Sequence, residues 1–139
     1  MKTRILITGL AFVSAISFGQ KKEIKKAEKA VKSSEFSEAI TYLNEAEALL
    51  ASADNDTKAQ FYAVKGQALY GTGGTDFTKL KASADAFSTA LSLDPKMEAQ
   101  LREPLQNLRA ALINGAIKDQ NAQQYKQATE KLYASYMLT

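Results

Sequence analysis

The chain of 139 residues contains no histidine, no cysteine and no tryptophan. Without histidine and cysteine it lacks imidazole bases, thiol nucleophiles, Ser-His-Asp triads and zinc sites of the usual ligand types. Because cysteine is missing, it also has no disulfide and no site for a diacylglycerol lipoprotein anchor, so packing alone must hold the fold. These absences predict a protein that is not an enzyme and that holds neither a cofactor nor a metal ion.

Short motifs for phosphate, calcium and nucleic acid are incomplete. The glycine-rich stretch Gly71–Gly74 is not followed by the Lys-Ser or Lys-Thr pair of a phosphate loop. Residues 54–56 (Asp-Asn-Asp) lack the central Gly and terminal Glu of a calcium loop, and they predict a helix-capping turn instead. Nucleic acid is not expected as a partner, because aromatic and basic residues do not interleave.

The first 19 residues have the organisation of a secretory signal peptide. Lys2 and Arg4 precede an uncharged run at 5–18, and Ser17-Phe18-Gly19 supplies the small residues of a cleavage site. We predict cleavage before Gln20, which can then cyclise, and export to the periplasm or the extracellular space. The run is too short to span a bilayer comfortably, so no stable membrane insertion is expected after cleavage. An uncleaved anchor is the alternative.

Cleavage also changes the charge balance of the chain. The whole chain has 18 basic and 15 acidic residues, and loss of Lys2 and Arg4 leaves 16 against 15. The mature chain is therefore close to neutral, and its basic isoelectric point does not argue for nucleic acid. Residues 20–139 are enough for one domain with its own core.

The clearest pattern lies between Ala59 and Pro95. Spacings of four and three among small and apolar residues predict a helix over 59–70, ended by the glycines of 71–74. Gly66 lies inside that helix, where glycine costs about 1 kcal/mol relative to alanine, so it indicates a close approach of two helices. A second amphipathic helix follows, with Thr75 or Asp76 as its cap, and Asp94-Pro95 stops it.

This unit resembles one repeat of the tetratricopeptide repeat family, a helix–turn–helix of 34 residues. The residues that carry the resemblance are Gly66 and Tyr70 in the first helix, Ser83 where alanine is usual, and Phe87, Ala90 and Pro95 in the second. About five extra residues near the glycines depart from the pattern, and a loop can absorb them. The resemblance implies an all-α fold, an α-solenoid of about three such repeats.

The resemblance extends to both sides of the central unit, giving repeats at about 21–53, 57–95 and 96–139. In the first repeat Ala27 aligns with Gly66, Ala39 aligns with Ser83, and Ser34 is expected to cap the second helix. The lysines of 21–32 are interpreted as a solvated face rather than as a patch for an acidic partner or a membrane.

The third repeat carries an insertion. With Ala116 at the small position of its first helix, about eleven residues are extra after Pro95, close to three helical turns. We therefore expect one long helix over 96–121, kinked at Pro104. Two helices, with Pro104 opening the second, are the alternative.

The resemblance also implies a function, the binding of a protein or peptide segment in a groove lined by first helices. Counting from the small residues nominates eight groove residues: Glu28, Lys32, Ala63, Gln67, Tyr70, Ile113, Gln120 and Asn121. Ile24, Ala63 and Ile113 would form an apolar floor. Tyr70 would be the main energetic anchor, since aromatic residues dominate binding hot spots; the alternative is that it packs under the 71–74 loop as core.

A second functional hypothesis arises from the last repeat. No polar capping helix follows it, although repeat arrays usually need one. The chain could thus be a structural subunit, or the N-terminal part of a longer array, that self-associates through the exposed helix at 125–138.

Overall fold

The computed structural model describes the backbone of residues 6–138 and the side chains of residues 18–138. Over that range the chain is helical with no strand, which confirms the all-α prediction. Its α-helices are α1 (Leu6–Lys32), α2 (Phe36–Glu47), α3 (Asn55–Gly73), α4 (Phe77–Leu93), α5 (Glu98–Asn121) and α6 (Tyr125–Tyr136), and its 3-10 helices are η1 (Leu50–Ser52) and η2 (Pro95–Met97).

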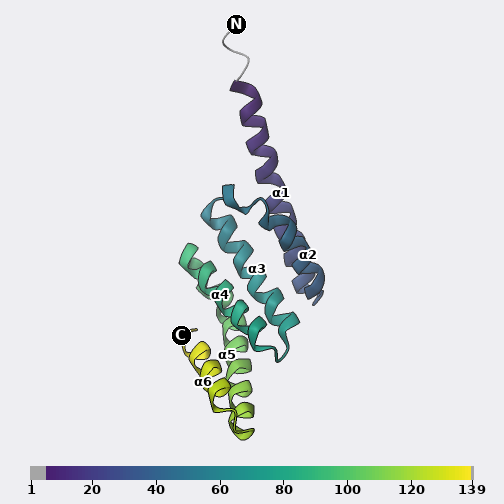
Figure 1. Ribbon diagram of the computed structural model, residues 1–139. Helices are drawn as coiled ribbons and strands as arrows, with labels where there is room; N and C mark the ends of the chain where they lie inside the picture. The colour runs from purple at the N-terminus through teal and green to yellow at the C-terminus, as the bar shows by residue number, and fades with distance from the viewer. Residues whose placement is uncertain (1–5, 139) are drawn as a thin grey trace.

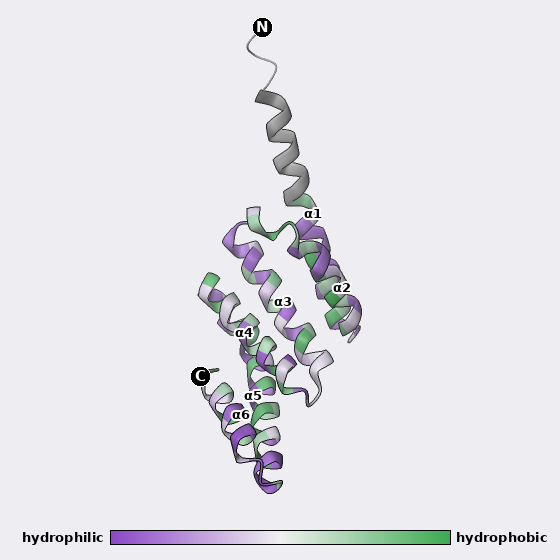
Figure 2. Cartoon of the chain, in the orientation of Figure 1, coloured by the Kyte–Doolittle hydropathy of each residue, from purple (hydrophilic) through white to green (hydrophobic). Residues whose placement is uncertain are grey.

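The helices are arranged as consecutive pairs (Figure 1). The most extensive contacts join α1 to α2, α3 to α4 and α5 to α6, while α2 against α3 and α4 against α5 link each pair to the next. As a result α1 and α6 lie at opposite ends of the array (Figure 1). Hydrophobic and hydrophilic residues alternate along α2 to α6 (Figure 2), as expected when each helix buries one face.

The core consists of two clusters that meet on α3. The first contains Leu43 and Phe61 and fills the space among α1, α2 and α3. The second contains Phe87 and Leu108 and fills the space among α3, α4 and α5. Tyr62 packs against both clusters, so apolar packing continues from one pair to the next.

Gly66 lies at a close approach of two helices, as its position in the sequence predicted. A Cβ atom added there would lie 2.6 Å from ring carbons of Phe87, which is fully buried. Any side chain at this position would therefore overlap the Phe87 ring. This contact joins α3 to α4 within one pair.

The glycines of 71–74 end α3 as predicted, but Gly71 itself lies within the helix rather than after it. The helix continues to Gly73, and a Cβ on Gly71 would lie 2.4 Å from the ring of Phe36 at the start of α2. The glycine is thus needed for a contact between neighbouring pairs rather than for a turn. Gly74, with φ of 56°, is the residue that leaves the helix.

The capping predictions had mixed outcomes. The Asp76 carboxylate accepts a 2.9 Å hydrogen bond from the Thr78 N–H at the start of α4, as expected. Ser34 does not cap α2, and that prediction was wrong. Its φ is 61°, and it belongs to the turn that closes α1, in which the Glu35 N–H donates to the Ala30 carbonyl oxygen at 2.8 Å.

The long helix predicted over 96–121 is present as one element. It begins at Glu98, after η2, and contains Pro104 in its interior, so the two-helix alternative was wrong. Within the residues that the structure describes, no helix is long and apolar enough to cross a membrane. The predicted signal peptide falls largely on residues 1–17, outside the described side chains, and export stays a prediction.

Candidate binding groove

A groove of about 700 Å³ opens along α1, α3 and α5, the first helices of the three pairs. It is lined by Glu28, Val31 and Lys32 of α1, Phe36 of α2, Gln60, Val64, Gln67 and Tyr70 of α3, and Gln100, Glu103, Pro104 and Asn107 of α5.

Helical spacing explains why these side chains share one surface. Gln60, Val64 and Gln67 are separated by four and three residues, which places them on one face of α3. Gln100, Glu103 and Asn107 are separated by three and four residues, which does the same on α5. The adjacent face of α5 carries Leu101 and Leu108, and it is anchored in the second core cluster.

Four of the eight predicted site residues, Glu28, Lys32, Gln67 and Tyr70, line this groove together. Ala63 does not line it, because its side chain is fully buried in the second core cluster. Tyr70 is half-buried and packs against that cluster while also lining the groove. Tyr70 thus lies at the border between the core and the groove, and its role as a binding anchor stays a prediction.

The remaining predicted residues, Ile113, Gln120 and Asn121, lie outside the groove. They belong to the C-terminal half of α5, whereas the groove is lined by residues 100–107 of that helix. These residues were nominated by counting from Ala116, which lies too far along α5. The groove-lining part of this helix is nearer its N-terminus. Ile24 is likewise buried in the first core cluster rather than in the groove floor.

The sequence contains a signal for the groove residues of α5 that the prediction missed. Two uncharged amides and one acid, Gln100, Asn107 and Glu103, repeat at helical spacing beside the face that carries the leucines of the same helix. Gln60 could have been found in the same way, because it lies seven residues before Gln67 on one helix face.

The groove offers hydrogen-bonding amides next to apolar surface. The side chains of Gln67, Gln100 and Asn107 make no hydrogen bond to any of the described residues, so both their donors and their acceptors are available. Val31, Phe36 and Tyr70 supply apolar contact area in the same groove. This combination suits a chain segment whose backbone amides need partners and whose side chains need apolar contacts.

The charges in the groove are few and of mixed sign. Glu28 is already engaged, because the Gln60 Nε2 donates a hydrogen bond to its Oε1. Lys32 on α1 and Glu103 on α5 are exposed and make no ion pair with other described residues. A ligand that crosses from α1 to α5 would therefore meet one free cation and one free carboxylate.

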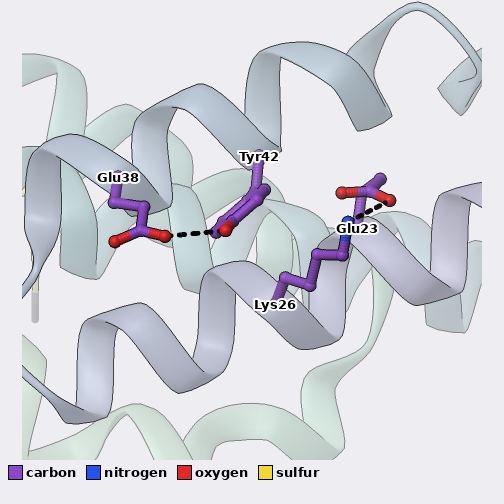
Figure 3. Close-up of polar contacts among 4 residues, drawn as sticks. All are labelled: Glu23, Lys26, Glu38 and Tyr42. Atoms are coloured by element: carbon purple, nitrogen blue, oxygen red, sulfur yellow. Dashed lines mark hydrogen bonds and ion pairs between the residues drawn. The ribbon is translucent and has the colours of Figure 1, made fainter.

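A polar cluster between α1 and α2 lies outside the groove (Figure 3). The Tyr42 hydroxyl donates a 2.7 Å hydrogen bond to Glu38, and this bond, with the charge of Glu38, raises the pKa of Tyr42 above its usual value. Lys26 pairs with Glu23 at 2.9 Å, and its ammonium lies 5.2 Å from the centre of the Tyr42 ring. Of these contacts, the one between Lys26 and the Tyr42 ring joins α1 to α2.

Among the described residues, no group of three or more acidic side chains is placed to hold a metal ion. Comparisons of the chain with protein-family models, with curated proteins and with solved structures gave no match. The groove is therefore the feature of the molecule that points to a function.

Proposed function

We propose that the chain is an exported tetratricopeptide-repeat-like scaffold whose groove binds an extended segment of another protein. It acts by binding rather than by catalysis, without a cofactor, in the periplasm or outside the cell. The observation that carries the proposal is the groove: the first helices of all three pairs line it, and three of its amides, Gln67, Gln100 and Asn107, lack partners among the described residues.

The turns within the pairs support a repeat architecture. Each pair is joined by a turn with one residue at positive φ: Ser34 at 61°, Gly74 at 56° and Gln123 at 60°. After α1 and α5 the closing hydrogen bonds also match, since the Gln124 N–H donates to the Asp119 carbonyl oxygen at 2.8 Å as Glu35 does to Ala30. Similar turns between similar helices are what a solenoid of helix–turn–helix repeats requires.

An extended peptide fits the groove chemistry better than a folded surface does. Side-chain amides can pair with both the N–H and the C=O groups of a peptide backbone, and the groove supplies them on two neighbouring helices. The half-buried Tyr70 ring offers an aromatic anchor at its base.

Selection of a displayed random peptide library on the immobilised protein would test this proposal. Tyr70→Ala should weaken binding of the selected peptides by about thirtyfold, and Gln67→Ala by about three- to tenfold. Gln106→Ala is the matched control, because Gln106 is an exposed amide on α5 that does not line the groove.

The melting temperature separates binding from folding in this experiment. Gln67→Ala and Gln100→Ala should leave it nearly unchanged, since neither side chain has a partner among the described residues. Equal affinities for wild type and the Gln67, Gln100 and Tyr70 variants would show that the selected peptides bind elsewhere and that the groove is not the site.

A further inference from the structure

The outward face of α6 is unlike that of the other second helices. Exposed apolar residues there include Tyr125 (62% exposed), Leu132 (48%) and Tyr133 (65%) on α6 and Met137 (59%) directly after it, and Ile117 of α5 is also exposed. The outward faces of α2 and α4 instead carry polar and charged residues such as Thr41, Glu45, Lys81 and Asp85. An exposed apolar patch of this kind marks an interaction surface.

Leu132 of α6 has equivalent positions on α2 and α4, and there other helices cover the side chain. Leu132 follows the small residue Ala128 by four positions, as Leu43 follows Ala39 and Phe87 follows Ser83. Leu43 and Phe87 are fully buried. The cluster around Leu43 includes Phe61 of α3, and the cluster around Phe87 includes Leu108 of α5, so in both cases the first helix of the next pair contributes to the cover. At α6 no described helix supplies that cover, so Leu132 and its apolar neighbours remain exposed.

We propose that this face of α6 is the interface of a homodimer, in which it packs against the same face of a second copy. The face carries two exposed charges of opposite sign, Lys126 and Glu130. Because it is neutral, it can meet its own copy without net repulsion. This interface is distinct from the groove, which α6 does not line.

A head-to-tail arrangement fits less well than a two-fold one. The helix at the other end of the array, α1, exposes Lys22, Lys25 and Lys29. Packing that surface on the tyrosines of α6 would remove three ammonium groups from water with a single carboxylate, Glu130, to pair them, which is unfavourable. A two-fold contact avoids this and also gives a closed dimer rather than an open filament.

The size of the patch predicts a dimer of moderate affinity. Five large apolar side chains exposed to this degree present on the order of 500 Å², and their polar neighbours bring the contact towards the roughly 800 Å² per partner of a standard interface. A dimer at the lower end of the standard size should dissociate in the micromolar range, at about 1–100 µM.

Light scattering during size-exclusion chromatography of the full chain, across that concentration range, tests the proposal. Wild type should shift from the mass of one chain to that of two as its concentration rises. Tyr133→Lys should stay monomeric throughout, while the matched control Thr41→Lys, at an exposed position of α2, should dimerise like wild type. Circular dichroism should show both variants to be as helical as wild type.

Two results would overturn the proposal. A wild-type chain that stays monomeric throughout this range does not use α6 to bind its own copy. A dimer that persists unchanged in both Tyr133→Lys and Tyr125→Lys forms through another surface. The peptide affinity of the groove should be the same in wild type and Tyr133→Lys, so the outcome is independent of the proposed function.

Discussion

The hydroxyl of Ser83 on α4 donates a 2.7 Å hydrogen bond to the carbonyl oxygen of Gly66 on α3. Both residues are fully or almost fully buried, and the Phe87 ring lies over Gly66 one turn further along α4. The missing side chain of Gly66 thus allows both the hydrogen bond and the ring contact. The two helices of the central pair are locked together at this point.

Replacement of Gly66 by alanine should destabilise the fold by about 1–3 kcal/mol, because the added Cβ would overlap a ring that cannot move freely. This loss should exceed the gain of about 1 kcal/mol that alanine gives an exposed helix position. Urea denaturation followed by circular dichroism measures the difference. Gly66→Leu should be at least as damaging, and a raised melting temperature for either variant would contradict the packing.

A double-mutant cycle with Phe87 distinguishes this overlap from a general effect of replacing glycine. In a Phe87→Leu background, Gly66→Ala should cost less than it does in wild type, since the smaller side chain leaves room. Gly71→Ala offers a second comparison. Its neighbour Phe36 is only half-buried and can shift, so the loss should be smaller than at Gly66.

Asp54 should make the stability of the fold depend on pH in the acid range. Its Oδ1 accepts a 2.7 Å hydrogen bond from the Thr57 N–H at the start of α3, and this bond, with a smaller effect of Lys21, lowers the pKa of Asp54 in the folded state. A lowered folded-state pKa stabilises the fold above the unfolded value, near pH 4, and that contribution is lost as the pH falls through the folded value.

Thermal melts of wild type and Asp54→Ala from pH 7 to pH 2 test this dependence. Wild type should melt at the higher temperature at pH 7, and the difference should narrow below about pH 4. Asp54→Asn keeps a side-chain acceptor but cannot titrate, so it should show less pH dependence than wild type. Parallel melting curves for wild type and Asp54→Ala would rule out the ionised cap.

The ion pair of Lys131 and Asp119 should contribute more than a surface pair does. The two side chains meet at 2.6 Å between α6 and α5, with only 14% and 12% of their surfaces exposed. Asp119→Ala would leave an unpaired ammonium in a mostly buried place, at a cost of about 2–3 kcal/mol.

The exposed pair Lys81–Asp85, at 3.1 Å on α4, is the control for this measurement. Asp85→Ala should change the free energy of unfolding by less than about 0.5 kcal/mol. The double variant Asp119→Leu with Lys131→Met should recover most of the loss, because no unpaired charge remains. Equal effects at Asp119 and Asp85 would show that burial does not strengthen the first pair.

Gln20 connects the predicted export of the chain to its folded structure. Its side chain is buried, and its Nε2 donates hydrogen bonds to the Leu49 carbonyl oxygen and, at 3.2 Å, to the Ser52 Oγ. Cyclisation of an N-terminal glutamine joins the α-amine to the side-chain carbonyl carbon and expels that nitrogen as ammonia. The folded mature protein should therefore begin with an uncyclised Gln20.

Intact mass measurement and N-terminal sequencing of the exported protein test both the cleavage before Gln20 and the uncyclised state of Gln20. The expected mass is that of residues 20–139 with an open glutamine, not the form lighter by one ammonia. Intact Met1 on soluble cytoplasmic protein would refute export. A cleaved but cyclised N-terminus would leave export standing and contradict the buried Gln20 contact.

Local signals in the sequence were enough for much of the secondary structure. The Asp76 cap, the uninterrupted helix through Pro104 and the all-α fold depend on side chain to backbone bonds and on helical spacing, which act over a few residues. Ser34 and Gly71 were misassigned because each has two possible roles, and for Gly71 one of them is a tertiary contact. Ser34 could cap α2 or close α1, and Gly71 could end α3 or receive the Phe36 ring.

The groove shows the same division between what local spacing determines and what the packing of helices determines. The sequence alone determined which residues share a face of their own helix, and so it brought Gln67 and Tyr70 together on α3. Only the tertiary structure decided which part of α5 faces α3. The long helix presents similar amphipathic spacing along its whole length, and the packing of Leu101 and Leu108 against α3 and α4 selects residues 100–107 for the groove rather than Ile113 or Gln120.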